Sequence, residues 1–92
     1  SIMNDINLLR AEFVHQIDLR GCRADEALKR LAKQIDNARL LGESEISVLH
    51  GKGDGILKTV LRDYLKECPE VESFKAARLD AGGEGITQIK LK

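Results

Sequence analysis

The chain of 92 residues is poor in aromatic residues, cysteine and proline, and it carries no net charge. Aromatic residues make up only 3% of it, which argues against a platform for stacking single-stranded bases. The two cysteines, Cys22 and Cys68, lack close spacing, so they predict reduced thiols rather than a disulfide framework. The balance of 15 basic and 15 acidic residues excludes a nucleic-acid binder that is basic all over, but it permits a local basic patch.

The length and the apolar pattern predict one domain that does not enter a membrane. No apolar run approaches the roughly 20 residues of a membrane-spanning helix, so we expect no membrane partner and a cytoplasmic location. Residues 1–11 have no clear partner within the chain, and we expect a linker or flexible lead-in there. Residues 12–92 are then a single domain.

Hydrophobic periodicity predicts the element order β-α-β-α-β-β. Alternating apolar residues indicate strands, whereas apolar residues at three- and four-residue steps indicate amphipathic helices. Right-handed crossovers make the first two strands parallel, and the last two strands form a hairpin. The fold class is therefore an α+β (α/β) two-layer sandwich, in which two helices cover a mixed four-stranded sheet. The expected strands are residues 13–19, 45–50, 71–79 and 86–91, and the expected helices are residues 24–38 and 57–68.

Candidate chemistry lies in the two loops that follow the first two strands, because ligands of open α/β sheets bind beyond the carboxyl ends of strands. The first loop carries Asp18 and Arg20, and the second carries His50 and Lys52. Parallel strands bring these four side chains to one edge. Two interpretations of Asp18 stay open, a helix or loop cap and a base or metal ligand, and His50 is a structural cap or a functional group. His15 is expected to be a partly buried histidine of the first strand.

Glycines alternate in the second loop, at Gly51, Gly53 and Gly55. Glycine lets backbone N–H groups approach an anion closely, and the start of the next helix adds positive potential. The loop lacks both the Walker A and the dinucleotide-binding patterns. It is either a phosphodiester site, to which Lys52 adds charge, or a turn that simply needs positive φ.

A basic stripe follows this loop along the second helix, formed by Lys58, Arg62 and Lys66 at four-residue steps. It is either a solvated face balanced by Asp63 and Glu67, or a track for nucleic-acid phosphates.

Three ordered motifs together resemble the Smr (small MutS-related) domain. They are residues 17–21 (IDLRG), residues 50–55 (HGKGDG) and residues 82–87 (GGEGIT), and the likeness covers about residues 15–91. The DLRG form with the HGKG loop is most similar to the Smr domain at the C-terminal end of the second bacterial MutS paralogue. The resemblance implies a fold like the C-terminal domain of translation initiation factor three.

The resemblance also implies function. It implies binding to DNA or RNA, the ribosome included, with nicking endonuclease activity. The longer proteins of this type resemble homodimeric ATPases linked to DNA repair, suppression of recombination and ribosome-collision rescue. ATP would bind other domains of such a protein, and we expect this fragment to be monomeric and to need no cofactor beyond a possible divalent metal.

Carried onto this chain, the resemblance assigns the first motif to Asp18 and Arg20 and the second to His50 and Lys52. We expect Arg20 and Lys52 to hold a phosphate, His50 to act as general acid or base, and Asp18 to orient or deprotonate a nucleophile or to coordinate a divalent ion. The expected phosphate-binding residues are Arg20, Gly51, Lys52, Gly53, Gly55, Lys58, Arg62, Gly82 and Gly83.

Two departures from the family pattern bear on catalysis. Stand-alone family nucleases usually carry histidine where this chain has Arg20, and arginine is no general base at neutral pH. Asp54 stands where threonine is common, and its carboxylate either repels a phosphate or recruits a metal. Two alternatives to a nuclease therefore remain: a non-catalytic module that docks on DNA or ribosomal RNA, and a module that binds another protein.

Overall fold

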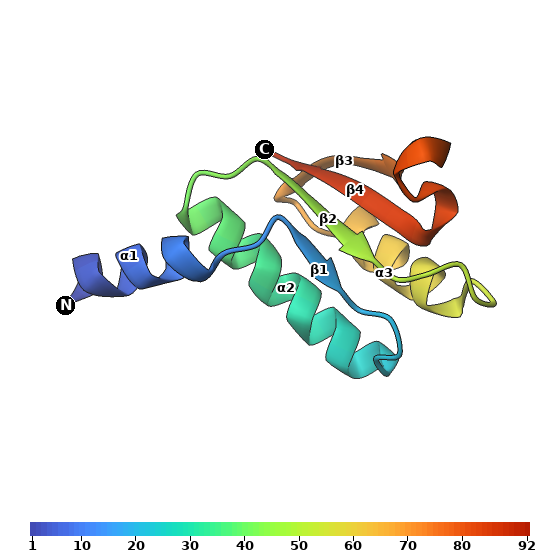
Figure 1. Ribbon diagram of the computed structural model, residues 1–92, viewed down its shortest axis with the longest axis horizontal. Coiled ribbons are helices and arrows are strands. Elements are labelled where there is room, and N and C mark those ends of the chain that lie inside the picture. Colours follow the sequence, from blue (N-terminus) through green and yellow to red (C-terminus); the bar gives the residue numbers. More distant parts are fainter.

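A computed structural model describes residues 1–92 as three α-helices, four strands and two short 3-10 turns (Figure 1). The bounds of the elements in chain order are α1 Ile2–Glu12, β1 Gln16–Asp18, α2 Ala24–Leu40, β2 Glu45–Leu49, α3 Ile56–Lys66, β3 Val71–Ala76, η1 Leu79–Ala81, η2 Gly83–Gly85 and β4 Ile86–Leu91.

The four strands form one mixed sheet in the order β1-β2-β4-β3. Strand β1 runs parallel to β2, while β4 is antiparallel to both β2 and β3. The expected parallel pair and the C-terminal hairpin are thus confirmed. The order matters for function, because β4 inserts beside β2 and brings the start of β4 next to the end of β2.

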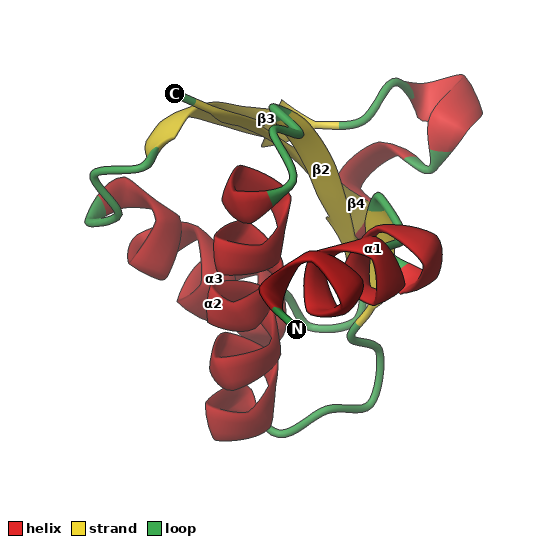
Figure 2. Ribbon diagram, turned by 90° about the vertical axis from the view of Figure 1, so that its left-hand side faces the viewer, coloured by secondary structure: helices red, strands yellow, loops and turns green.

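Helices α2 and α3 cover one face of the sheet, and the other face carries no helix (Figure 2). The two-layer arrangement follows from alternation in the strands: Ile46 and Val48 of β2 are buried toward the helices, whereas the residues between them are not. The buried cluster joins both helices to β2, to β4 and to the residue after β1. It consists of Leu19, Ala27, Leu31, Ile35, Ala38, Ile46, Val48, Leu61, Leu65, Ile89 and Leu91.

Helix α2 ends at Leu40 rather than at the expected residue 38, and Gly42 closes it. Gly42 has a φ of +75°, and its amide donates to the Arg39 carbonyl. The next amide, that of Glu43, donates to the Ala38 carbonyl. This pair of bonds is a Schellman motif, which needs a residue in the left-handed conformation and therefore favours glycine.

Three expected strands are longer than the observed ones, and the second of them, which ends at Leu49 rather than residue 50, differs least. The first strand begins at Gln16 rather than at residue 13, because it is an edge strand with register only against three residues of β2. His15 precedes it and is exposed, with its Nε2 3.0 Å from a Glu43 carboxylate oxygen, so the expectation of a partly buried histidine is wrong. The third strand ends at Ala76 rather than Leu79, and Leu79 lies 93% exposed in η1.

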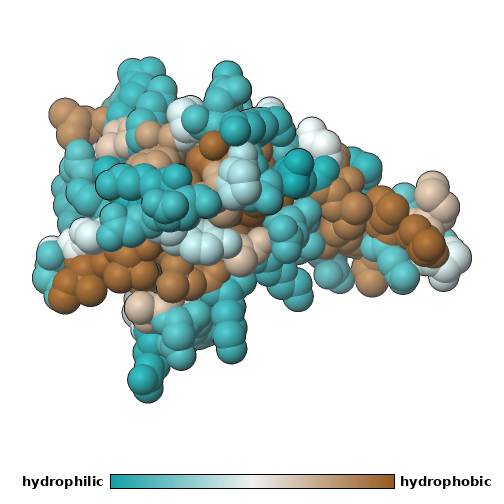
Figure 3. All heavy atoms as spheres, turned by 180° about the vertical axis from the view of Figure 1, so that it is seen from behind, coloured by the Kyte–Doolittle hydropathy of each residue, from teal (hydrophilic) through white to brown (hydrophobic).

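The expected lead-in over residues 1–11 is helical. Ser1 caps α1 by accepting a hydrogen bond from the Asn4 amide, and none of the residues of α1 is buried. The helix projects from the domain, and Figure 3 shows apolar side chains exposed on that projection. Ile2, Met3 and Leu8 are each more than half exposed. No helix of the structure combines the length and the hydropathy that crossing a membrane requires.

The assignment of the core predicts that two leucine-to-alanine substitutions, one buried and one exposed, differ strongly in their effect on the free energy of unfolding. Leu61→Ala removes a fully buried side chain and is expected to lower the free energy of unfolding by about 2–5 kcal/mol. Leu40→Ala makes the same change at a side chain that is 62% exposed and is expected to cost about 0.5 kcal/mol or less. Chemical denaturation measures both values, and equal losses would contradict the assigned core.

Candidate functional site

Two glycine-rich loops far apart in sequence are joined through one carbonyl group. The amides of His50 and Gly51 both donate to the Gly85 carbonyl, each at 3.0 Å. This contact continues the β2–β4 ladder, in which Leu49 pairs with Ile86. The HGKGDG loop after β2 and the GGEG turns before β4 therefore form a single edge of the domain.

The joined loops lie within van der Waals contact of each other and of Arg20. A Cβ on Gly85 would lie 3.6 Å from the backbone of Gly51 and 3.7 Å from the Cγ of Lys52. A Cβ on Gly51 would lie 3.5 Å from the Cγ of Arg20. Gly51 also has a φ of +80°, which other residues rarely adopt. The structure thus brings Arg20, from the loop after β1, against the glycine loop after β2, as the parallel strands predict.

The glycine loop presents backbone amides without partners. Gly51, Gly53 and Gly55 have positive φ, and the residues between them do not. Successive left- and right-handed residues turn their N–H groups toward one side, an arrangement that binds anions. The amides of Lys52, Gly53, Asp54 and Gly55 donate to no acceptor within the chain. The structure confirms the turn that needs positive φ, and this conformation leaves the donors free. The phosphodiester site stays a prediction.

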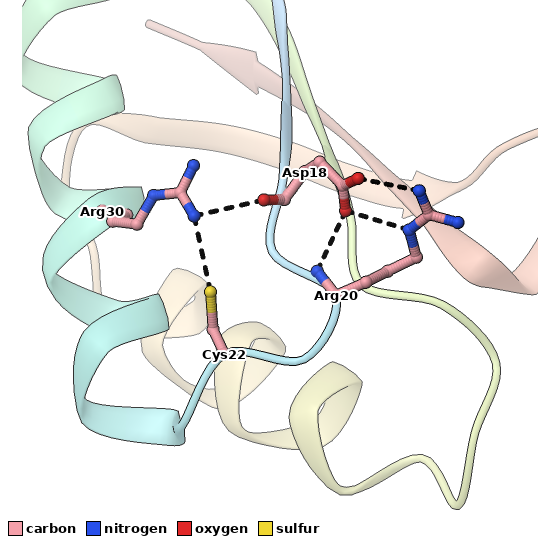
Figure 4. A network of polar contacts seen from close by, with 4 residues as sticks. All are labelled: Asp18, Arg20, Cys22 and Arg30. Carbon is pink, nitrogen blue, oxygen red and sulfur yellow. Dashed lines mark hydrogen bonds and ion pairs between the residues drawn. The ribbon is translucent and has the colours of Figure 1, made fainter.

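Asp18 and Arg20 form a two-point ion pair at the end of β1 (Figure 4). The guanidinium donates from Nε to Oδ1 at 3.0 Å and from an Nη to Oδ2 at 2.8 Å, and the Arg20 amide also donates to Oδ1. On the other side of Asp18, Arg30 of α2 donates to its backbone carbonyl and lies 3.4 Å from the Cys22 sulfur. The loop conformation after β1 is thus fixed from both sides.

The ion pair sets the charge state of the carboxylate. The hydrogen bonds and positive charge of Arg20 lower the pKa of Asp18 from 3.8 to about 2. Asp18 is therefore fully ionised at neutral pH and too weakly basic to be an efficient general base. Its stabilising contribution is present above pH 3.8 and is lost as the pH falls toward 2.

His50 is buried, and both of its ring nitrogens are used inside the protein. Its Nδ1 lies 2.8 Å from the Gly51 carbonyl oxygen, which only accepts, so Nδ1 carries a hydrogen. Its Nε2 lies 2.9 Å from the hydroxyl oxygen of the fully buried Thr87. In the neutral ring this nitrogen accepts the Thr87 hydroxyl hydrogen. Neither nitrogen faces solvent, which favours the structural interpretation of His50.

The surroundings of His50 favour its neutral form. Burial lowers the pKa of His50 below its ordinary 6.5, and the positive charges of Arg62 and Lys58 act in the same direction. The hydrogen bond to the Gly51 carbonyl and the charge of Glu84 oppose them. At neutral pH the ring is therefore an uncharged link between β4 and the glycine loop.

The members of the basic stripe each have a partner inside the chain. Lys58 donates to the Glu84 carboxylate at 2.8 Å, and this bond lowers the pKa of Glu84. Arg62 turns toward the sheet, donates from Nε to the Thr87 hydroxyl oxygen at 3.2 Å and lies over the Phe74 ring. Lys66 lies 3.7 Å from Asp63. The three residues therefore do not present one continuous row of free cations.

The other residues predicted for the site, Gly82, Gly83 and Asp54, each make contacts within the protein. Gly82, with a φ of +109°, leaves no room for a Cβ beside Ile86, and the buried Gly83 continues the same turn. Asp54 accepts a hydrogen bond from the Ile56 amide at the start of α3. No three histidine, cysteine, aspartate or glutamate side chains gather to hold a metal ion, and Asp18 and Asp54 each bond protein donors instead.

The largest hollow of the surface, about 680 Å³, lies elsewhere. It occupies the uncovered face of the sheet, where Ser47, Lys75 and Gln88 are among its lining residues, and it contains none of the predicted site residues. The candidate site is accordingly an exposed edge rather than an enclosed pocket, which suits a long polymer better than a small molecule.

Sequence reasoning missed Thr87 and Glu84 as parts of this edge. Both lie within the third motif, whose glycines Gly82, Gly83 and Gly85 were expected to close over the edge. The β2–β4 pairing would have identified them, because Leu49 opposite Ile86 sets His50 beside Gly85. That pairing of distant strands has no signal in the local pattern.

Comparison with known proteins agrees with this arrangement. The model of the family described as "Smr domain" matches residues 17–92. Endonuclease MutS2 of Solidesulfovibrio magneticus is 46% identical over 76 residues, which are 83% of this chain and 10% of that protein. Endonuclease MutS2 of Clostridium novyi is 41% identical over a segment of the same length and coverage.

Solved structures show the same fold. The crystal structure of the Smr domain of Thermus thermophilus MutS2 is 40% identical, with a TM-score of 0.83, and the match covers 86% of this chain and 99% of that one. YdaL of Escherichia coli, a stand-alone small MutS-related protein, is 23% identical with a TM-score of 0.80, over 85% of this chain and 64% of that one. This second likeness shows the fold alone.

The fold and the joined motifs define a mixed α+β module built around glycine loops at one sheet edge. The chain belongs to the Smr domain family, and its curated relatives at about 40% identity are MutS2 endonucleases. It spans about a tenth of the length of those relatives.

The Asp18–Arg20 pair gives a prediction that needs no substrate. An NMR titration of the Asp18 carboxyl carbon is expected to give a pKa of about 2. Arg20→Gln removes the charge and the two-point contact, so the pKa is expected to rise toward 3.8. Arg23→Gln is the matched control, because Arg23 approaches Asp25 instead, and it is expected to leave Asp18 unchanged. An unshifted Asp18 in Arg20→Gln would show that the pair does not form in solution.

Proposed function

We propose that this domain binds the backbone of DNA or RNA at the edge formed by its two glycine loops and cleaves a phosphodiester bond there. One observation carries the proposal: the bonds to the Gly85 carbonyl hold a glycine loop whose amides at residues 52–55 have no acceptor, and Gly51 of this loop lies against Arg20. Free amides and cations that converge on an exposed edge suit a phosphate diester, whose charge lies on its non-bridging oxygens.

The names of the relatives support the same chemistry. Those that match over most of this chain are called endonucleases. An endonuclease acts on phosphodiester bonds within a polymer, and an open edge lets a chain pass through without a free end. We extend that activity to this domain as a proposal.

The groups at the edge have different roles. Lys52 is exposed and has no ion-pair partner, so we assign it to the phosphate. Arg20 shares its guanidinium between Asp18 and the approaching phosphate and stabilises charge that develops in the transition state. Asp18, being ionised, keeps Arg20 in place and orients the attacking nucleophile. His50 supports the loop from inside, since its ring nitrogens bond Gly51 and Thr87.

A second candidate function is a docking module without catalysis. It is favoured by the neutralisation of the cations: Arg20 is paired with Asp18 and Lys58 with Glu84. Such a module would bind DNA or ribosomal RNA weakly and leave cleavage to other domains. In a longer MutS2-type protein, we propose that either activity would serve recombination control or ribosome rescue, with ATP bound by domains outside this chain.

A cleavage assay on the purified chain separates the two functions. Supercoiled plasmid and single-stranded RNA are incubated with and without a divalent cation. Under the nuclease proposal the parent cleaves one of them. Asp18→Ala is expected to lower the rate at least about 100-fold, because Arg20 loses the partner that keeps it in place. His50→Ala is expected to lower the rate because the glycine loop loses its internal support. Asp25→Ala, a surface carboxylate on α2, is the control and is expected to keep the parent rate.

The outcomes are distinct. Cleavage that is equal in parent, Asp18→Ala and His50→Ala would remove both residues from the mechanism. Binding of either nucleic acid with no cleavage under any condition would favour the docking module instead.

Binding itself has a separate prediction. Lys52→Ala is expected to weaken binding of an oligonucleotide and to reduce the slope of log K against log salt by about 1, as loss of one phosphate contact does. Lys33→Ala removes an exposed cation from α2, away from the edge, and is the matched control. Fluorescence anisotropy at several salt concentrations measures both, and an equal slope for Lys52→Ala and the parent would contradict the assignment of Lys52.

A further inference from the structure

A chain of hydrogen bonds runs from α3 through β4 to the glycine loop. Arg62 donates from Nε to Thr87, the Thr87 hydroxyl lies on Nε2 of His50, and Nδ1 of His50 donates to the Gly51 carbonyl. Thr87 is fully buried, and the imidazole ring links Arg62 and Thr87 to the glycine loop.

The direction of each bond follows from what its members can donate. A guanidinium has no lone pair to offer, so Thr87 accepts from Arg62 and has its own hydrogen free for another acceptor. The lone pair of Nε2 is that acceptor as long as His50 carries its hydrogen on Nδ1. Arg62 therefore favours the one ring form that also bonds Gly51.

The placement of Arg62 is costly for a residue whose task is stability alone. One of its terminal nitrogens is buried without any hydrogen-bond partner. A buried donor without an acceptor destabilises a protein, and a charged one more so. The guanidinium also lies 5.9 Å from the centre of the Phe74 ring, which holds it against the sheet. A cation that is fixed here at such cost points to an effect on its neighbours.

We propose that Arg62 and Thr87 are positioning residues of the candidate site, which hold the His50 ring so that it clamps the glycine loop against β4. The inference leads to two tests. The first measures the titration of His50 and does not depend on the proposed function. The second measures binding of nucleic acid and rests on the proposed function. Arg62 thereby loses its predicted role as a phosphate contact and acts from behind the loop.

The charged groups that face His50 decide the sign of the first test. Arg62 and Lys58 of α3 disfavour the imidazolium, whereas Glu84 of η2 favours it. Arg62→Gln removes one of the two cations and keeps a group that can donate to Thr87. The titration midpoint of His50, followed by long-range proton–nitrogen NMR, is therefore expected to rise toward 6.5.

Lys66→Gln is the matched control. Lys66 lies one turn further along α3 and approaches Asp63, so its loss is expected to leave the His50 midpoint at the parent value. If Arg62→Gln gives the parent midpoint, Arg62 does not act on His50 and the proposal is overturned. If Arg62→Gln does not fold, Arg62→Lys decides the role of the hydrogen bond: it keeps the charge but loses the planar donor, and a parent-like nitrogen spectrum would also overturn the proposal.

The second test uses the Thr87 hydroxyl. Thr87→Val keeps the shape of the side chain but removes its hydrogen bonds to His50 and Arg62. It is expected to weaken binding of a single-stranded oligonucleotide roughly tenfold, because a residue of the site loses the hydrogen-bond partner that orients it. Thr87→Ser restores the hydroxyl and is expected to restore binding. Thr59→Val, an exposed position on α3, controls for the substitution itself.

The two tests separate this inference from the proposed function. A shifted His50 midpoint in Arg62→Gln supports the positioning role even if the parent binds no nucleic acid, which would contradict the proposed function alone. Equal binding by the parent and by a folded Thr87→Val would overturn the link from Thr87 to the loop. Weak binding by both Thr87→Val and Thr87→Ser would show that packing, not the hydroxyl, is what matters, and would overturn it as well.

Discussion

The site depends on one carbonyl group. The Gly85 oxygen accepts hydrogen bonds from two consecutive amides, those of His50 and Gly51, and so joins loops that are more than thirty residues apart in sequence. This contact exists because β4 inserts between β2 and β3 and pairs with both. Gly51 has a φ of +80° at this contact, a conformation that other residues rarely adopt. The sheet order and the glycines therefore act together, and neither would build the edge alone.

The balance of positive and negative charge is the second constraint on the site. A domain with no net charge cannot attract nucleic acid through its overall field, so any attraction must come from local geometry. Two cations near the edge already have carboxylate partners, Asp18 for Arg20 and Glu84 for Lys58. Such pairs hold side chains in position at the cost of affinity. The backbone amides of the glycine loop keep their donors free, which makes them the centre of the phosphate recognition that we propose.

The architecture could be predicted from sequence because its signals are local. Alternation in β2 and β4 and the helical repeat of α2 each reflect burial of one face, and Gly42 marks the end of α2. The parallel pairing of β1 and β2 follows from the handedness of the crossover. The ends of the strands were predicted less accurately. Residues 13–15 do not belong to β1, because this edge strand pairs only with β2 and only over three residues.

Contacts within the site were predictable only where two parallel strands had to converge. The approach of Arg20 to the glycine loop follows from that geometry, and the structure shows it. The inward turn of Arg62 was not predictable, because four-residue spacing gives the helix face but not the direction of a long, flexible side chain. The role of Thr87 was hidden for the same kind of reason, since its bonds reach residues 25 and 37 positions away.

The most direct test of this account is an NMR titration of the whole chain, labelled with nitrogen-15, with a short oligonucleotide of DNA or RNA. The account predicts that the largest changes in amide shift fall on residues 51–55, with Arg20 and Gly85 beside them. Changes concentrated instead on the uncovered sheet face, at Ser47, Lys75 and Gln88, would contradict the claim that the joined glycine loops form the binding edge.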